Sequence, residues 1–113
     1  MRIISGKFKG KKIFQPKDKS TRPLKDITKE SIFNIIEHSN LFNLKIRKSH
    51  ILDLFSGVGS FGLECLSRGS LSVFFFENYS GVLPILKKNI MILNFEEKTN
   101  IFERDIFNDK TLH

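Results

Sequence analysis

The sequence predicts an α/β fold built as one half of a doubly wound parallel sheet. After residue 48, three short apolar runs alternate with two segments of helical pattern. A glycine-rich turn joins the first apolar run to the first helical segment. This order favours parallel strands, because neighbouring parallel strands need a crossover connection that is usually a helix. Three such strands correspond to half of a doubly wound sheet.

The first half of this pattern is a strand, a helix and a second strand. Residues 50–55 form a short apolar run that ends at a Ser-Gly pair and predicts a buried strand. Residues 59–68 have a helical pattern, which Gly69 ends. Residues 72–77 contain consecutive Val and Phe residues, and they predict a second buried strand rather than an aromatic surface for stacking.

The last two predicted elements are a helix over residues 81–94 and a strand over residues 100–104. Pro84 falls in the first turn of this helix, where its missing N–H leaves no hydrogen bond unmade. Ile101 and Phe102 are the centre of the third strand.

The N-terminal region predicts a short basic β-hairpin followed by a helix. Apolar residues and lysines alternate loosely over residues 2–14, with turn-forming glycines at positions 6 and 10. Residues 29–37 have one apolar side, and Asp26 or Thr28 can cap that helix. We therefore divide the chain into a basic N-terminal hairpin or arm, residues 1–25, and an α/β domain with strands one to three, residues 26–113.

The positive charge of the chain is concentrated at its N-terminal end. The formal net charge is +7, but residues 1–48 carry 13 Lys+Arg and 4 Asp+Glu, whereas residues 49–113 carry 6 and 8. A nucleic acid fits such a region better than a membrane, because no long amphipathic basic helix is present in residues 1–25. Compositional drift toward lysine is the alternative, although drift would affect both halves of the chain.

The cysteine and histidine content indicates a protein of the reducing cytoplasm that holds no metal. One cysteine excludes an internal disulfide framework and a cysteine-rich zinc site, and we interpret Cys65 as a packing residue. The three histidines lack metal-ligand spacing. No apolar stretch approaches the ~18 residues that a membrane span needs, so we expect no membrane partner.

The turn after the first strand carries the candidate cofactor-binding residues. Gly57, Gly59 and Gly62 form the pattern G-x-G-x-x-G, which is typical of a backbone that a ligand approaches closely. Glu77 lies 20 residues after Gly57, at the end of the second strand, where a carboxylate can accept hydrogen bonds from ribose hydroxyls. A tight turn and a solvated acid are the purely structural alternatives.

Asp53 favours S-adenosylmethionine over a dinucleotide as the ligand. Its carboxylate would repel a pyrophosphate at the adjacent helix N-terminus, but it would attract the ammonium and sulfonium groups of S-adenosylmethionine. Asp105, at the end of the third strand, could then accept a hydrogen bond from the adenine amino group. Alternatively, Asp105 caps a following helix.

Several segments resemble the bacterial 16S ribosomal RNA guanine-N2 methyltransferases (RsmD-like). They are Met-Arg-Ile-Ile-Ser-Gly at 1–6, Thr-Arg-Pro at 21–23, Leu-Asp-Leu-Phe-Ser-Gly at 52–57 and Gly-Leu-Glu-Cys-Leu-Ser-Arg-Gly at 62–69. The resemblance covers the whole chain in order. It implies the N-terminal half of a Rossmann-like S-adenosylmethionine-dependent methyltransferase fold, preceded by the basic hairpin and the helix.

The resemblance also implies a reaction and its site residues. The reaction is methyl transfer from S-adenosylmethionine to the exocyclic N2 amine of a guanine in 16S rRNA, with rRNA in the small ribosomal subunit as the partner. The cofactor-binding residues are expected to be Asp53, Gly57, Gly59, Gly62, Glu77 and Asp105. The expected RNA-binding residues, drawn from the basic region, are Arg2, Lys7, Lys9, Lys11, Lys12 and Arg22.

This chain departs from the family where the target base would bind. The resemblance implies an Asn/Asp-Pro-Pro-aromatic motif after a fourth strand, which would hold the target amine and stack on the base. The prolines at 16, 23 and 84 are not adjacent, and nothing after Asp105 predicts a fourth strand. We therefore expect the N-terminal part of a longer enzyme, without catalytic residues and inactive by itself. The first strand would then be an exposed edge that a missing C-terminal half or a second chain covers.

Two other function classes remain open on the sequence. A non-catalytic RNA-binding module would keep the basic region and use the α/β half as a scaffold. A nucleotide-dependent oxidoreductase would use the glycine turn for a dinucleotide, although Asp53 disfavours that ligand.

Overall fold

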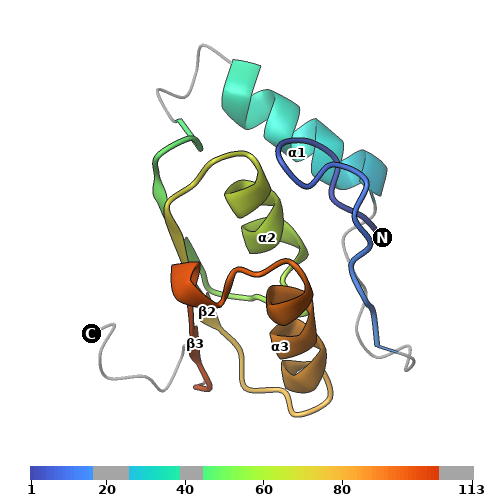
Figure 1. Cartoon of the computed structure of the whole chain (residues 1–113), viewed down its shortest axis with the longest axis vertical. Coiled ribbons are helices and arrows are strands. Elements are labelled where there is room, and N and C mark those ends of the chain that lie inside the picture. Colours follow the sequence, from blue (N-terminus) through green and yellow to red (C-terminus); the bar gives the residue numbers. More distant parts are fainter. Residues whose placement is uncertain (17–25, 39–44, 105–113) are drawn as a thin grey trace.

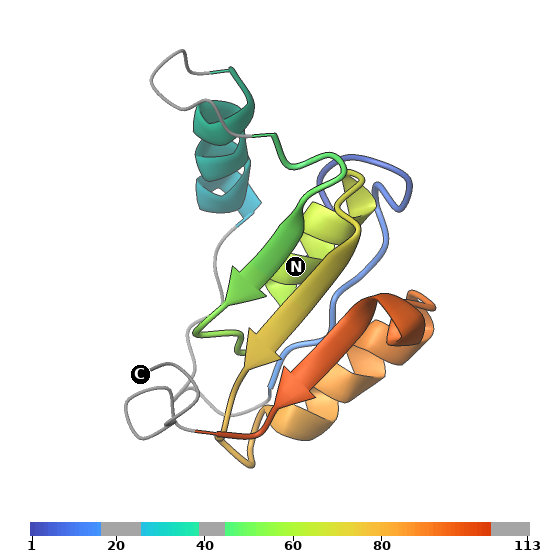
Figure 2. The ribbon, with the colours of Figure 1, turned by 90° about the vertical axis from the view of Figure 1, so that its left-hand side faces the viewer.

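The structure, a computed structural model, describes residues 1–16, 26–38 and 45–104. Its centre is a sheet whose described strands are β1 (His50–Asp53), β2 (Ser72–Phe76) and β3 (Thr99–Phe102). The strands are parallel and lie in the order β1-β2-β3, and Figure 2 shows all three pointing the same way. The predicted α/β class and parallel order are confirmed, and each strand ends slightly earlier than predicted.

Helices α2 (Ser60–Ser67) and α3 (Leu83–Ile92) cover one face of the sheet, behind the strands in Figure 2. Both strand–helix–strand units progress in one direction across the sheet, and right-handed crossovers then place both helices on the same side. Because strand side chains alternate between faces, Val73 and Phe75 of β2 point into this layer and are fully buried. They belong to the main core cluster, which both helices share.

The two helices end with the same hydrogen-bonding arrangement. After α2, the backbone N–H groups of Gly69 and Ser70 donate to carbonyls of the last helical turn. Asn94 and Phe95 do the same after α3. Each arrangement satisfies two carbonyls that the helix itself leaves free, and it confirms Gly69 as the residue that ends α2.

The opposite face of the sheet has no helix over it among the described residues (Figure 2). Leu52 of β1 and Phe74 of β2 remain 52% and 36% exposed there, and the Phe102 ring of β3 stacks on Phe74 with 6.0 Å between centroids. The buried-strand interpretation is therefore confirmed for Phe75 and Phe76, whereas Phe74 faces outward. β1 lies at an edge of the described sheet, as predicted.

The N-terminal segment runs beside α2 and α3 (Figure 1). It reverses direction as predicted, but its described antiparallel pairing is one bridge between Arg2 and Lys12 instead of two strands. The turn bonds to α2: the Lys7 N–H donates to the Ser67 carbonyl and the Phe8 N–H to the Ser67 hydroxyl. Extending the bridge toward the turn would need the N–H of Ser5, which instead donates to the carboxylate of Glu64 on α2 at 3.0 Å. A donor that is used by the helix cannot also form a strand ladder, which explains the missing strands.

The N-terminal segment and helix α1 (Asp26–His38) each bury apolar side chains, in two neighbouring core clusters. Ile3 and Ile13 of the N-terminal segment are each 1% exposed and join the core cluster of α2 and α3. Helix α1 packs Phe33 against Cys65 of α2, and the short 3-10 helix η1 (Glu96–Lys98) precedes β3. No described helix is long and apolar enough to cross a membrane.

A buried ion pair joins α1, α2 and the N-terminal segment. Lys29 of α1 and Glu64 of α2 are both fully buried, with 3.3 Å between the ammonium nitrogen and a carboxylate oxygen. Glu64 also accepts hydrogen bonds from the backbone of Ile4 (2.8 Å) and Ser5 (3.0 Å) and from Arg68 (2.8 Å). Burial lowers the pKa of Lys29, and neighbouring Glu64 offsets part of this effect. The segment cannot leave α2 without removing two donors from a buried carboxylate.

Candidate functional site

The glycine loop connects β1 to α2 at the carboxyl end of the sheet, which is where ligands bind in doubly wound folds. Gly57 has a φ angle of 53° and Gly59 one of 90°, conformations that glycine adopts without strain. A Cβ atom added at Gly57 would meet nothing within 4 Å, so the loop backbone is accessible there. A Cβ atom at Gly59 would lie 2.6 Å from Leu86 of α3, so the small size of Gly59 also serves packing.

Gly62 lies inside α2 and is buried. A Cβ atom at this position would overlap the Phe75 ring and lie 2.9 Å from Val73. The third glycine of the pattern therefore allows α2 to pack closely on β2. The structure gives it this packing role, and its assignment to the cofactor stays a prediction.

Glu77 follows β2, and its carboxylate bonds to the backbone around the glycine loop. One oxygen accepts the N–H of Gly57 at 2.7 Å, and the other accepts the N–H groups of Asn78 (3.2 Å) and Tyr79 (3.1 Å). The residue is half-buried, so it is not simply a solvated acid. A carboxylate offers about four acceptor positions, which leaves one for a further donor such as a hydroxyl group.

Asp53, the last residue of β1, has one carboxylate oxygen in use and one without a partner. Oδ1 accepts the backbone N–H of Phe55 at 3.3 Å. Oδ2 is buried and has no hydrogen-bond partner among the described residues. Burial raises the pKa of Asp53 above its ordinary value, and the charge of Glu77 raises it further, while the backbone amides of Phe55 and, least of all, Gly62 lower it. A buried carboxylate oxygen without a donor is costly, so this position suits a bound cation or hydrogen-bond donor.

The described side chains predicted to bind RNA are exposed, but they lie at two ends of α2. The backbone of Lys7 bonds to the last residue of α2, far from the glycine loop. Arg2 bridges to Lys12, and the Arg2 carbonyl accepts a hydrogen bond from Lys29, which also contacts Ser60 at the start of α2. The end of the segment that carries Arg2 and Lys12 is therefore level with the glycine loop. The exposed residues are Arg2, Lys7, Lys9, Lys11 and Lys12; Arg22 and Asp105 lie outside the described residues.

Sequence analysis missed Asn89, which connects the N-terminal segment to the glycine loop. Asn89 lies on α3 and is 2% exposed. Its Oδ1 accepts the Phe14 N–H at 2.8 Å, and its Nδ2 donates to the carbonyls of Phe14 (3.1 Å) and Val58 (3.0 Å). Its position in the sequence could have revealed it. Asn89 comes three residues after Leu86 and four before Leu93, a spacing that places it on the apolar side of the helix, where a polar residue is unexpected.

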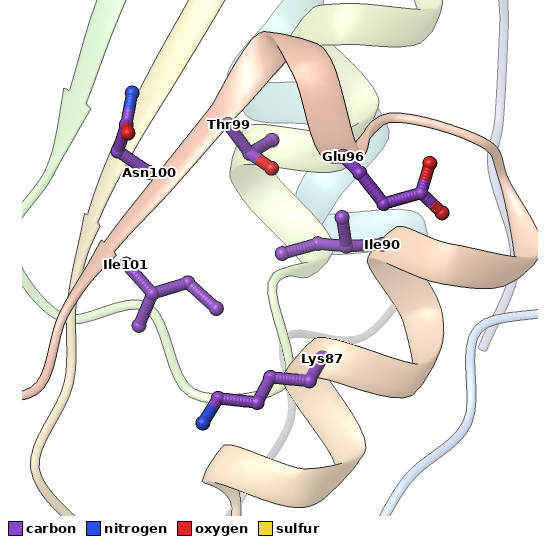
Figure 3. Close-up of a pocket in the computed structure, with 6 residues that line it drawn as sticks. All are labelled: Lys87, Ile90, Glu96, Thr99, Asn100 and Ile101. Atoms are coloured by element: carbon purple, nitrogen blue, oxygen red, sulfur yellow. The ribbon is translucent and has the colours of Figure 1, made fainter.

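A pocket of about 320 Å³ lies between α3 and β3, at the sheet edge away from the glycine loop (Figure 3). Figure 3 shows the side chain of Lys87 directed toward β3, and its ammonium group pairs with Glu103 at 2.5 Å. None of the predicted site residues lines this pocket. In the described ranges, no three His, Cys, Asp or Glu side chains gather closely enough to hold a metal ion.

Solved structures with this architecture include two methyltransferase-like proteins. The Escherichia coli protein yhhF, described as a candidate methyltransferase, matches with a TM-score of 0.76 and 28% identity, over 93% of this chain and 52% of that chain. A candidate methylase from Haemophilus influenzae matches with a TM-score of 0.67 and 30% identity, over 96% of this chain and 53% of that one. The fold and the glycine-loop site therefore define the class: the N-terminal half of a Rossmann-like methyltransferase fold.

The chain belongs to the family described as Conserved hypothetical protein 95, whose family model matches residues 1–111. Ribosomal RNA small subunit methyltransferase D of Haemophilus influenzae is 34% identical over 112 residues, covering 99% of this chain and 53% of that protein. The protein of the same name from Buchnera aphidicola subsp. Baizongia pistaciae is 39% identical over 94 residues, covering 83% and 45%. These matches confirm the predicted family. The chain spans about half the length of the curated relatives it matches.

Proposed function

We propose that this chain is the cofactor-binding part of an rRNA methyltransferase that uses S-adenosylmethionine. The observation that carries the proposal is the buried Oδ2 of Asp53 beside the glycine loop, which has no hydrogen-bond partner among the described residues. S-adenosylmethionine has an ammonium and a sulfonium group, and either would be attracted by a carboxylate in a partly desolvated site. A pyrophosphate at the same place would be repelled, which disfavours a dinucleotide.

The residues around Asp53 fit the other parts of this cofactor. The backbone at Gly57 has open space on its Cβ side, so a ligand can lie directly against the loop. The free acceptor position of Glu77 suits a ribose hydroxyl, since this acid follows the strand next to β1. Gly59 shapes the loop, Gly62 lets α2 pack closely on β2 behind it, and Asp105 is proposed for the adenine amino group. When bound, the cofactor supplies an electrophilic methyl group, and these residues hold and orient it.

We propose the family's implied acceptor, the N2 amine of a guanine in 16S rRNA, for the whole enzyme. The relatives named Ribosomal RNA small subunit methyltransferase D support an rRNA substrate within the small ribosomal subunit, and we propose the cytoplasm as the place of the reaction. The exposed basic residues of the N-terminal segment, together with Arg22, would contact the RNA backbone. The 113 residues contain no Pro-Pro pair, so we propose that this chain does not transfer a methyl group by itself.

Calorimetric titration with S-adenosylmethionine tests the cofactor assignment directly. We expect the 113-residue chain to bind S-adenosylmethionine and S-adenosylhomocysteine and to show no binding of NAD. Asp53→Asn should weaken the binding, because the neutral amide no longer attracts the cofactor's positive groups. Glu96→Gln removes one negative charge from an exposed position on η1 and is the matched control.

Four results would contradict the proposal or a part of it. Equal affinities for the unsubstituted chain and Asp53→Asn would remove Asp53 from the site. RNA binding without S-adenosylmethionine binding would favour the non-catalytic RNA-binding module, and preferential binding of NAD would favour an oxidoreductase. Transfer of labelled methyl to 16S rRNA by the purified chain would show that it is active alone.

A further inference from the structure

Two lysines from distant parts of the sequence meet over one aromatic ring. The ammonium nitrogen of Lys88, on α3, lies 4.0 Å from the centroid of the Phe14 ring, and that of Lys12 lies 5.4 Å from the same centroid. Both distances are within the ~6 Å range of cation–π contacts. Both lysines are exposed, and Phe14 is half-buried. The ring attracts both cations, whereas the cations repel each other.

Neither of these lysines has an acidic partner in the part of the chain that the structure describes. The ion pairs found there use Arg2, Lys29, Arg68 and Lys87. Lys87 is the neighbour of Lys88 on α3, but its ammonium group is paired with Glu103. No acid of the described segments compensates the charge of Lys12 and Lys88, and an anion placed between them would relieve their mutual repulsion.

The backbone of Phe14, the residue whose ring contacts the two lysines, is anchored to α3. Both backbone polar groups of Phe14 are bonded to the side chain of Asn89, at 2.8 and 3.1 Å. The same amide donates to the Val58 carbonyl in the glycine loop at 3.0 Å. The carbonyl and amino groups of the buried Asn89 side chain are thus both used to join Phe14 to the glycine loop. This connection positions the two lysine ammonium groups near Phe14 relative to the loop.

We propose that Lys12, Phe14 and Lys88 form a binding surface for the phosphodiester backbone of single-stranded RNA, positioned beside the glycine loop by Asn89. The proposal rests on the RNA substrate proposed above and adds α3 to the RNA-binding surface. It assigns Lys12, and not Lys7, to this surface, because the backbone of Lys7 bonds to the far end of α2. A flexible polyanion suits two exposed ammonium groups, which neutralise phosphates without needing a particular base sequence.

The salt dependence of RNA binding separates a phosphate contact from general positive charge. Each neutralised phosphate of a single strand contributes about 0.7 to the slope of log affinity against log salt concentration. We expect Lys88→Ala to lower that slope by about 0.7 for binding of the 113-residue chain to a single-stranded oligouridine. Lys87→Ala removes the same charge from the adjacent position, and we expect its slope to equal that of the unsubstituted chain, because Lys87 is paired with Glu103.

A second variant tests the ring. Phe14→Leu keeps the backbone bonds to Asn89 and both lysine charges, so we expect weaker binding with an unchanged salt slope. Thermal unfolding followed by circular dichroism confirms that each variant is folded.

Equal slopes for Lys88→Ala and Lys87→Ala would overturn this surface, even if the chain binds RNA. Unaltered affinity of Phe14→Leu would overturn the role of the ring. Failure of the unsubstituted chain to bind the oligouridine would overturn both the surface and the proposed RNA contact, while the S-adenosylmethionine titration would still stand.

Discussion

Replacing Lys29 with methionine removes one partner of the buried ion pair while keeping a side chain of similar length. Breaking a buried pair in this way costs about 3–5 kcal/mol, because the remaining charge is left in a low-dielectric interior. Glu64 would keep its hydrogen bonds from Ile4, Ser5 and Arg68, so we expect the lower end, about 3 kcal/mol. That loss reduces the folded-to-unfolded ratio by about two orders of magnitude.

Urea unfolding followed by far-ultraviolet circular dichroism measures this loss, since the chain has no tryptophan. With a slope of about 1.5 kcal/mol per M, Lys29→Met should lower the urea midpoint by about 2 M. Lys87→Met is the control, because it breaks an ion pair whose side chains are 56% and 50% exposed. Exposed pairs contribute about 0–1 kcal/mol, so its midpoint should move by less than about 0.7 M. Similar shifts in the two variants would refute the reasoning.

The order in which substitutions at Glu64 and Lys29 destabilise the chain gives a second test. Glu64→Leu removes the acceptor for Lys29, Arg68 and two backbone N–H groups. Each buried donor that loses its acceptor is costly, so Glu64→Leu should destabilise the chain more than Lys29→Met. The reverse order would mean that the carboxylate is not the centre of the network.

Three further outcomes follow from the site and the core. Burial raises the pKa of the Asp53 carboxyl above its ordinary value of 3.8. Between pH 3.8 and this raised pKa the folded state binds more protons than the unfolded state, so the free energy of unfolding falls as the pH rises through this range. Asp53→Asn should therefore raise the urea midpoint at neutral pH, with a gain that vanishes at acidic pH; a lower midpoint at neutral pH contradicts this. Burial raises the pKa of the Cys65 thiol to about 12. A chromogenic disulfide reagent near neutral pH should therefore modify the folded chain far more slowly than the urea-unfolded chain. Equal rates would show that the thiol is accessible in the folded chain. Gly62→Ala should cost about 1–3 kcal/mol by overpacking against Phe75, and Gly57→Ala about 1–2 kcal/mol by backbone strain. A urea midpoint of Gly62→Ala equal to or above that of the unsubstituted chain would exclude the packing role.

Local patterns in the sequence predicted the described fold well. The strands over residues 50–55 and 72–77 and the helix ended by Gly69 depend on neighbouring residues, whose preferences are local. The N-terminal hairpin was less accurate, because Glu64 of α2 takes the backbone donor of Ser5 that two strands would need. A competing partner 59 positions away in the chain leaves no trace in a local pattern.

The candidate site shows the same division between local and distant effects. The glycine pattern with Asp53 and Glu77 could be found by spacing, because each residue is tied to the end of a strand. The role of Asn89 could not, since its partner Phe14 is 75 positions away. The packing role of Gly62 also depends on a ring that only the folded sheet brings near it.

The sequence by itself determined the strand–helix order, the family, the glycine loop and the concentration of positive charge before residue 49. These properties reside in short segments and in composition. The tertiary structure decided which groups are paired: Glu77 bonds to the loop backbone, and Asp53 keeps a buried oxygen that no donor of residues 1–16, 26–38 or 45–104 reaches. It also separated the basic side chains, leaving Lys7 at one end of α2 and bringing Lys12 to Lys88 at the other. Partners of buried and charged groups come from distant segments, so only packing determines them.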